Sequence, residues 1–142
     1  MKSIACALIV LSLLPMDSAA RQTRASPDGA VFVAYYWRAK PGQLEAYNQY
    51  IKTVAELIDE DARKAGVFEE ARTVNPAPGT TTDWTHLRIF RLKDAAAEKA
   101  LAAGLDAATE RVVPNEAQRK ANGERSASLR DLVRREVWTE LR

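Results

Sequence analysis

The sequence contains few of the residues on which metal and thiol chemistry depend. Its 142 residues include one cysteine and one histidine. A single cysteine excludes an internal disulfide framework and a cysteine-rich zinc site. A single histidine disfavours a histidine-rich metal site, so the sequence predicts neither a metal ion nor another cofactor.

The sequence also lacks an excess of either positive or negative charge. Twenty-one basic and 19 acidic side chains leave a formal net charge of +2. This mixture provides no basic patch of the kind that binds nucleic acid or a membrane surface. The sequence has no glycine-rich phosphate loop and no Gly-x-Ser-x-Gly motif. The familiar catalytic motifs therefore assign no reaction to this chain.

The first twenty residues have the three-part pattern of a secretory signal peptide. Lys2 precedes an apolar run over residues 4–14, and Ser18–Ala20 supplies small residues before a cleavage point. The apolar run is too short to span a bilayer comfortably. We therefore predict a signal peptide over residues 1–20, a periplasmic or secreted mature protein, and no stable membrane insertion after cleavage. The alternative is an uncleaved membrane anchor.

Removal of the signal peptide changes what the working protein contains. Cys6 leaves with it, so the mature chain has no thiol. Residues 21–29 are polar and rich in structure-breaking residues, which predicts a flexible leader. The folded domain is expected to occupy residues 30–142. Without disulfides it must be held together by packing or by oligomerisation.

Strand-like and helix-like patterns alternate from Ala30 onward. Ala30–Arg38 is rich in β-branched and aromatic residues and almost continuously apolar, which is typical of a central strand covered on both faces. Apolar residues at spacings of three and four predict a helix over Gln43–Ala65, stopped by Gly66. Further strands are predicted at 67–74, 84–91 and 132–141.

The segment before the last strand is long. Asp94 is well placed to cap a helix through the following alanine-rich residues, and Gly104 predicts a break in it. Leu105–Val113 is helical again, followed by another turn or two. Leu105–Arg130 exceeds what the minimal fold requires, and we expect it to cover a cavity as a lid or to extend a dimer contact.

This order of elements specifies a fold class. Strand, helix, strand, strand, helix and strand, with right-handed crossovers, give an α+β, ferredoxin-like βαββαβ sandwich. Its four-stranded antiparallel sheet carries both helices on one face. The opposite face, called the open face below, must be solvated, hold a ligand or meet another sheet.

The first strand and its turn also resemble a known superfamily. The stretch Val31–Gly42 (VFVAYYWRAKPG), followed by Leu44, Glu45 and Tyr47, resembles the opening of the dimeric α/β-barrel proteins, which include the antibiotic-biosynthesis-monooxygenase-like domains. Residues 84–96 resemble the third strand and second helix start of that superfamily. The resemblance implies a homodimer whose two sheets pack face to face.

The resemblance implies several activities. Some members of the superfamily are cofactor-independent oxygenases that act on polycyclic phenols, and others degrade haem. The haem-degrading kind uses an Asn on the first strand, and Val31–Arg38 has none. This absence argues against haem degradation. The oxygenases share no single catalytic signature, so no residue can be carried over from them.

The distribution of aromatic residues independently favours a dimer. Eight of the ten aromatics fall in the predicted strands, and one helix layer is too small to cover so many large side chains. A second subunit or a ligand would bury the remainder. The eight are Phe32, Tyr35, Tyr36, Trp37, Phe68, Trp84, Phe90 and Trp138.

The strand at 84–91 carries the candidate catalytic residue. Its alternation places Trp84, His86, Arg88 and Phe90 on one face, which we expect to be the open face that a partner subunit would enclose. His86 could act as a general base or as a ligand of an iron-bearing cofactor. The alternative is a structural histidine that forms a hydrogen bond at the dimer interface.

The same face supplies the candidate ligand-binding residues. Arg88, with Arg38 and Glu136 from neighbouring strands, could recognise a carboxylate or phenolate, or could form ion pairs between strands or between subunits. A second set, of aromatic residues, could form the wall of a pocket or the core of an interface. This second set is Trp84, Phe90 and Trp138.

Three functions remain open from the sequence. The first is an exported homodimeric protein that binds a small aromatic or acidic ligand in a cavity on the open face. The second is a cofactor-independent, monooxygenase-like enzyme acting on a phenolic or polycyclic substrate. The third is a structural interaction domain, in which Ala95–Ala108 packs against another helix.

Overall fold

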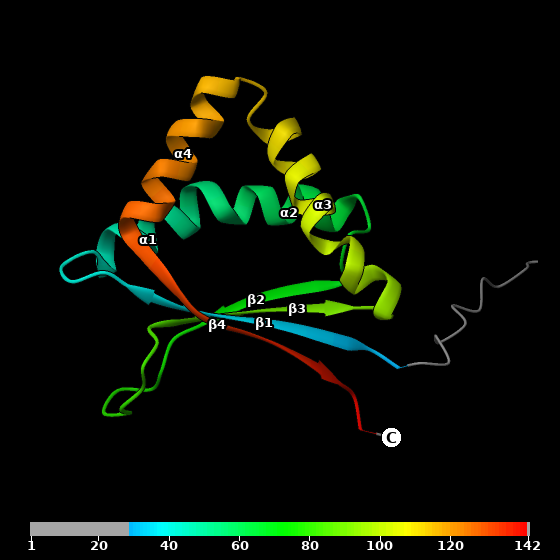
Figure 1. Cartoon of the computed structure of the whole chain (residues 1–142), viewed down its shortest axis with the longest axis horizontal. Coiled ribbons are helices and arrows are strands. Elements are labelled where there is room, and N and C mark those ends of the chain that lie inside the picture. The colour runs from blue at the N-terminus through cyan, green and yellow to red at the C-terminus, as the bar shows by residue number, and fades with distance from the viewer. Residues whose placement is uncertain (1–28, 142) are drawn as a thin grey trace, which may run out of the picture.

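The computed structural model describes residues 29–141 (Figure 1). The predicted signal peptide and nearly all of the leader lie outside these residues. The described elements, in chain order, are β1 (Val31–Ala39), α1 (Leu44–Tyr50), a π-helical turn η1 (Ile51–Ala55), α2 (Glu56–Lys64), β2 (Glu70–Val74), β3 (His86–Leu92), α3 (Ala95–Val112), α4 (Glu116–Leu129) and β4 (Arg130–Thr139).

The strands form one sheet in the order β2-β3-β1-β4, and every neighbouring pair is antiparallel. Within residues 29–141 the helices all lie on one side of this sheet, and the other side carries none (Figure 1). This is the predicted ferredoxin-like α+β sandwich. The first strand lies inside the sheet between β3 and β4, as its apolar sequence indicates.

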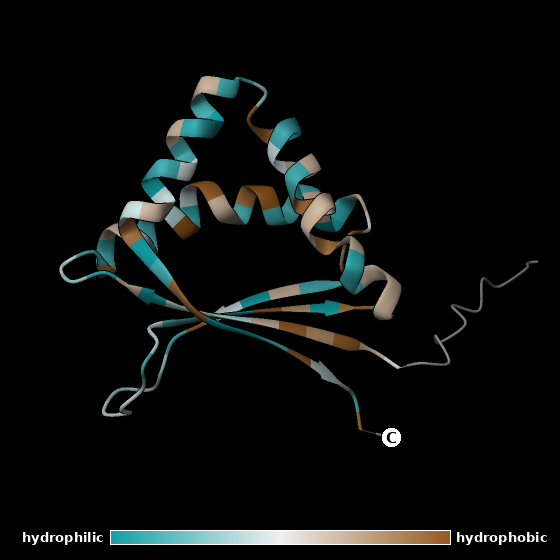
Figure 2. Ribbon diagram, viewed as in Figure 1, coloured by the Kyte–Doolittle hydropathy of each residue, from teal (hydrophilic) through white to brown (hydrophobic). Residues whose placement is uncertain are grey.

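Alternation along β1 separates the two faces of the sheet. Val31 and Val33 point toward the helices and are buried, whereas Phe32 between them points to the open face. The first half of β1 is hydrophobic, while α4 is largely hydrophilic (Figure 2). Two clusters of buried residues form the core between sheet and helices. They are Val31, Val33, Ala62, Phe68, Phe90, Leu92, Leu101 and Ala108, and then Tyr47, Tyr50, Ile51, Ala55 and Leu129.

The helix predicted over Gln43–Ala65 is present as α1, η1 and α2 in direct succession. It differs from the prediction in its middle, where Ile51–Ala55 form a π-helical turn. Gly66 ends the helix with a φ of +77°, a conformation in which glycine has no steric penalty.

The predicted break at Gly104 is wrong, because α3 continues through it to Val112. The glycine instead permits a close approach. A Cβ atom at this position would lie 2.4 Å from Cγ1 of Val67, which comes just before β2. The predicted cap is confirmed, since Asp94 Oδ1 accepts a 2.8 Å hydrogen bond from the backbone N–H of Ala97.

The residues after Pro114 form more structure than the sequence predicts. The expected turn or two is the 14-residue helix α4, capped by Asn115, whose Oδ1 accepts from the Gln118 N–H. Both α3 and α4 lie on the helix side of the sheet (Figure 1). Of the two expectations for Leu105–Arg130, a lid over the open face is therefore wrong, and an extension of the dimer contact stays a prediction.

The strand bounds also differ from the prediction. β2 begins at Glu70, because Val67 and Phe68 pack against the core before strand pairing starts. β3 begins at His86, which leaves Trp84 in the preceding loop.

Among the residues that the structure describes, no helix combines the length and apolar character needed to cross a membrane.

Candidate functional site

The predicted catalytic face of β3 is turned toward the helices. His86 is 1% exposed, Phe90 3% and Arg88 9%. All three contact residues of the helix layer or its core, so their expected position on the open face is wrong. The period-two alternation was correct from His86 onward, but alternation does not say which face is inside. Two polar residues on the buried face are tolerated because helices supply partners for both.

His86 is held by hydrogen bonds at both ring nitrogens. Its Nε2 lies 2.8 Å from Oδ1 of Asn48 on α1, and its Nδ1 lies 2.9 Å from Oγ1 of Thr85. The ring also meets Tyr47 edge to face, with centroids 4.4 Å apart. Burial, together with the charge of Arg130, lowers the pKa of His86 from 6.5 to about 4.

These contacts define the protonation state of His86. A neutral imidazole with its proton on Nε2 donates to Asn48 and accepts from the Thr85 hydroxyl. Protein groups therefore occupy both nitrogens that a general base or a metal ligand would use. His86 is thus a structural histidine whose hydrogen bonds lie within one subunit, between β3 and α1, and the expected place at a dimer interface is wrong. The catalytic interpretation stays a prediction without a geometric counterpart.

Arg88 forms an ion pair with Asp59 of α2, and both side chains are largely buried. Its guanidinium carbon also lies 5.4 Å from the centroid of the Phe90 ring. Burial raises the pKa of Asp59, and the Arg88 charge opposes that rise. The arginine thus ties the sheet to α2 and does not face a ligand on the open face.

Arg130 is a site residue that the sequence analysis missed. Its guanidinium carbon lies 3.6 Å from the centroid of Trp37, and its Nη1 donates to the Tyr47 hydroxyl at 2.8 Å. It also lowers the pKa of His86. The sequence did not identify Arg130 as a site residue, because only a turn or two of helix was predicted where the full helix α4 leads directly to it.

The other predicted site residues belong to the open face. Trp84 meets Tyr36 there edge to face at 5.7 Å. Glu136 accepts a 3.0 Å hydrogen bond from the Tyr36 hydroxyl and a 2.9 Å hydrogen bond from Arg134 Nε. Arg38 donates from Nε to the carbonyl oxygen of Asp83 at 2.8 Å. Arg38 and Glu136 are therefore engaged within the protein.

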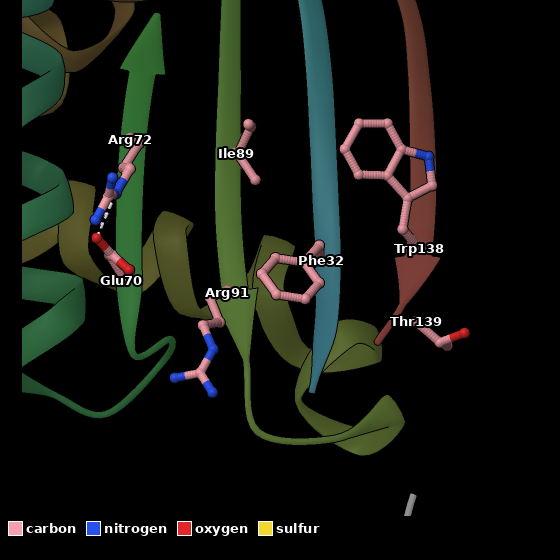
Figure 3. Close-up of a pocket in the computed structure, with 7 residues that line it drawn as sticks. All are labelled: Phe32, Glu70, Arg72, Ile89, Arg91, Trp138 and Thr139. Carbon is pink, nitrogen blue, oxygen red and sulfur yellow. Dashed lines mark hydrogen bonds and ion pairs between the residues drawn. The ribbon is translucent and has the colours of Figure 1, made fainter. Parts of the chain in front are cut away.

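A pocket of about 500 Å³ lies at one end of the open face, where β1 begins and β3 and β4 end. We call it the sheet pocket. Three side chains from adjacent strands, Phe32, Ile89 and Trp138, form its apolar floor (Figure 3). Trp138 is 40% exposed, which is unusual for so large an apolar side chain. Of the predicted site residues, Trp138 alone lines this pocket.

Charged side chains form the rim of the sheet pocket. Arg91 pairs with Glu69 at 2.7 Å, and Arg72 pairs with Glu70 at 2.5 Å. A guanidinium has five N–H donors, so one glutamate leaves donors available on each arginine. The pocket can therefore hold an apolar ring on its floor and an anionic group at its rim.

The sequence contained a signal for this pocket. Leu87, Ile89 and Arg91 alternate with the buried residues of β3, and an alternating strand must present one of its two sets outward. Phe32 similarly alternates with two valines.

In residues 29–141, His, Cys, Asp and Glu side chains form no group of three that could hold a metal ion.

Comparison with known proteins finds no matching family model and no matching curated sequence. Solved structures do match. HapK from Hahella chejuensis has a TM-score of 0.53 at 12% identity, covering 78% of this chain and 92% of that chain. A NIPSNAP family protein of unknown function from Agrobacterium tumefaciens has a TM-score of 0.58 at 12% identity, covering 82% and 93%.

A third similar structure is a dimeric protein of unknown function from Bacteroides fragilis, described as having a ferredoxin-like fold. Its TM-score is 0.50 at 16% identity, covering 79% of this chain and 97% of that chain. At these identities the similarity shows the fold alone. It supports the ferredoxin-like fold and does not single out the antibiotic-biosynthesis-monooxygenase-like domains.

Proposed function

We propose that the protein forms a homodimer through the open face of its sheet and binds a small aromatic anion in the sheet pocket. The observation that carries this proposal is the apolar floor of Phe32, Ile89 and Trp138 beside two arginines on a sheet face without helices. Floor and rim together match a ring that bears a carboxylate or phenolate.

The exposed apolar side chains of the same face support the proposed dimer. Trp138 is 40% and Val74 is 41% exposed there. Large apolar surfaces of this kind are buried when two copies associate around a twofold axis. The similar protein from Bacteroides fragilis is described as dimeric, which supports the proposal.

Substitution of Trp138 tests the dimer. We expect light scattering to give twice the monomer mass for the wild type at micromolar concentration and the monomer mass for Trp138→Glu. Leu57→Glu is the matched control, because Leu57 is 56% exposed on α2, on the other side of the sheet. A monomeric wild type would contradict the proposal, and so would a dimeric Trp138→Glu variant.

A pair of ligands tests the pocket. 2-Naphthoate and 2-naphthylmethanol share a ring system, and only the first carries a charge. We expect Arg91→Met to weaken naphthoate binding about tenfold, or ~1.4 kcal/mol, in calorimetric titration and to leave the alcohol unaffected. Arg63→Met is the control, since Arg63 is an exposed residue of α2. The pocket assignment fails if neither compound binds or if the two arginine variants behave alike.

The proposal includes export to the periplasm or the medium, after cleavage at the end of residues 1–20. It is supported by the basic start, the apolar run and the small residues before Arg21. Expression in an exporting host followed by mass spectrometry tests it. We expect a mature chain that begins at Arg21, and an intact Met1 would refute cleavage.

A further inference from the structure

A second pocket lies at the opposite end of the sheet, between α1 and the loop of residues 75–85 that connects β2 to β3. We call it the loop pocket. Its volume is about 420 Å³, within the usual range for small-molecule sites. It shares no residue with the sheet pocket. Its lining residues are Leu44, Asn48, Asn75, Pro76, Thr80, Thr81, Thr82, Trp84 and Thr85.

The lining contains no charged side chain. Four threonines and two asparagines supply hydroxyl and amide groups, and Trp84 and Leu44 supply apolar surface. A charged ligand would lose hydration here without gaining a partner of opposite charge. The loop pocket therefore selects a neutral molecule.

The loop that forms one wall is tied down at both ends. Asn75 Nδ2 donates to the carbonyl oxygen of Thr85 at 2.7 Å, and Arg38 Nε donates to that of Asp83 at 2.8 Å. Arg134 adds an ion pair with the Asp83 carboxylate at 3.2 Å. The loop extends past the sheet on the side away from the helices (Figure 1). Its attachments preform the wall, which lowers the cost of ordering it around a ligand.

Asn48 is oriented by a buried residue behind it. His86, 1% exposed, holds Oδ1 of Asn48 at 2.8 Å, and the neutral ring is the donor in this bond. The Asn48 amide NH₂ therefore remains available to donate a hydrogen bond to a ligand in the pocket. Among residues 29–141, no side-chain hydrogen bond uses that NH₂ group.

The polar groups of the wall complement this donor. Asn75 uses its amide nitrogen within the loop, which leaves its Oδ1 as an acceptor. The hydroxyls of Thr80 and Thr81 form no hydrogen bond within the described residues, and each can both donate and accept. The pocket thus offers donors and acceptors close to the surface of one indole ring.

We propose that the loop pocket binds a neutral sugar, with a C–H face of the ring on Trp84 and its hydroxyls on Asn48, Asn75, Thr80 and Thr81. A sugar hydroxyl needs a partner for both its hydrogen and its lone pairs, and these residues provide both. A pyranose also has an apolar face for the tryptophan. This site shares no residue with the sheet pocket.

Two-dimensional NMR of the full mature chain tests the proposal. The probes are methyl α-D-glucopyranoside, methyl β-D-galactopyranoside, N-acetylglucosamine, maltose and lactose, with glucuronate as the charged control. The chain has three tryptophans, and Trp84→Phe and Trp138→Phe assign their indole N–H signals. We expect at least one neutral sugar to shift the Trp84 signal with a Kd of about 1 mM or tighter, and glucuronate to shift nothing.

The variant Thr80→Val/Thr81→Val separates a binding role from a structural one. It removes two hydroxyls that hold nothing in the fold, so the amide spectrum should remain native while sugar affinity falls at least fivefold. Thr53→Val is the matched control on the exposed side of η1, and it should leave affinity unchanged. The proposal is overturned if no neutral sugar binds, if binding shifts Trp138 instead of Trp84, or if the double variant binds as the wild type does.

Discussion

Arg88 on β3 forms an ion pair with Asp59 on α2 inside the layer between sheet and helices, where their side chains are 11% and 16% exposed. A charge removed from such a pair leaves its partner buried and unpaired. That penalty is larger than the net stabilisation from the pair itself. The pair joins β3 to α2, and either residue alone would destabilise the fold.

The first prediction is a double-mutant cycle on this pair. We expect Arg88→Met and Asp59→Leu each to lower the free energy of unfolding by ~3 kcal/mol, because each leaves one buried charge unpaired. The double variant should lose less than either single variant, since no charge remains. Urea unfolding of the four proteins measures this, and additive losses would show that the two side chains are not coupled.

The second prediction concerns the pH dependence of stability. The pKa of His86 is about 4 in the folded protein and 6.5 without the fold, so the unfolded state binds more protons between these values. The contribution of the neutral His86 to the free energy of unfolding should be fully present above pH 6.5. It should decrease as the pH drops toward 4, by at most ~3 kcal/mol.

The comparison with His86→Gln isolates this contribution. Glutamine does not titrate, so the loss between pH 6.5 and 4 should be smaller in the variant. The raised pKa of Asp59 acts in the opposite direction and is common to both proteins. Parallel pH profiles for the two proteins would argue against a buried neutral histidine.

The third prediction is that Arg130 contributes, after burial, to the lowered pKa of His86. Arg130→Met removes a positive charge that lowers this pKa, so the pKa should rise in the variant. The chain has one histidine, so its ring proton can be followed by NMR without ambiguity. Arg134→Met is the control, because Arg134 stacks on Tyr36 at the open face. An unchanged pKa in Arg130→Met would contradict the prediction.

The fourth prediction compares the same substitution in two helices. Gly104→Ala should lower stability by about 1–3 kcal/mol, because the added methyl would overlap Val67. Gly123→Ala should raise stability by about 0.5–1 kcal/mol, because nothing lies within 4 Å of an added Cβ there. Thermal unfolding measures both. Shortening the neighbour in Val67→Ala/Gly104→Ala should recover part of the loss, and stabilisation by Gly104→Ala alone would refute the close approach.

The element types were predictable because their signals are local. The apolar density of Ala30–Arg38 and the spacing of apolar residues after Gln43 depend only on neighbouring positions, and both elements are present. The predicted break at Gly104 is wrong because the reason for this glycine is tertiary. Val67 lies so close to α3 that there is no room for a side chain at this position. The extent of α4 failed because that helix is largely hydrophilic and lacks an apolar stripe.

The inward face of β3 was not predictable from the strand alone. Its two alternating sets both mix polar and apolar residues, and the partners that bury His86 and Arg88 come from a helix about 30 to 40 positions earlier. A partial signal did exist in that helix. Asn48 and Asp59 each directly follow a residue of its apolar stripe, Tyr47 and Ile58, which places them at the border of the buried face. The position alone does not identify them, because Lys52 and Arg63 also follow stripe residues and are exposed.

The π-helical turn at Ile51–Ala55 has a consequence for how the chain tolerates a change in its length. Such a turn is an α-helix that has taken in one extra residue without displacing the segments on either side. Loss of one residue here, for example the exposed Thr53, would convert the turn to ordinary α-helix. Asn48 would keep its place against His86 and Asp59 its place against Arg88. This stretch of the sequence can therefore shorten by one residue while both contacts with the sheet remain.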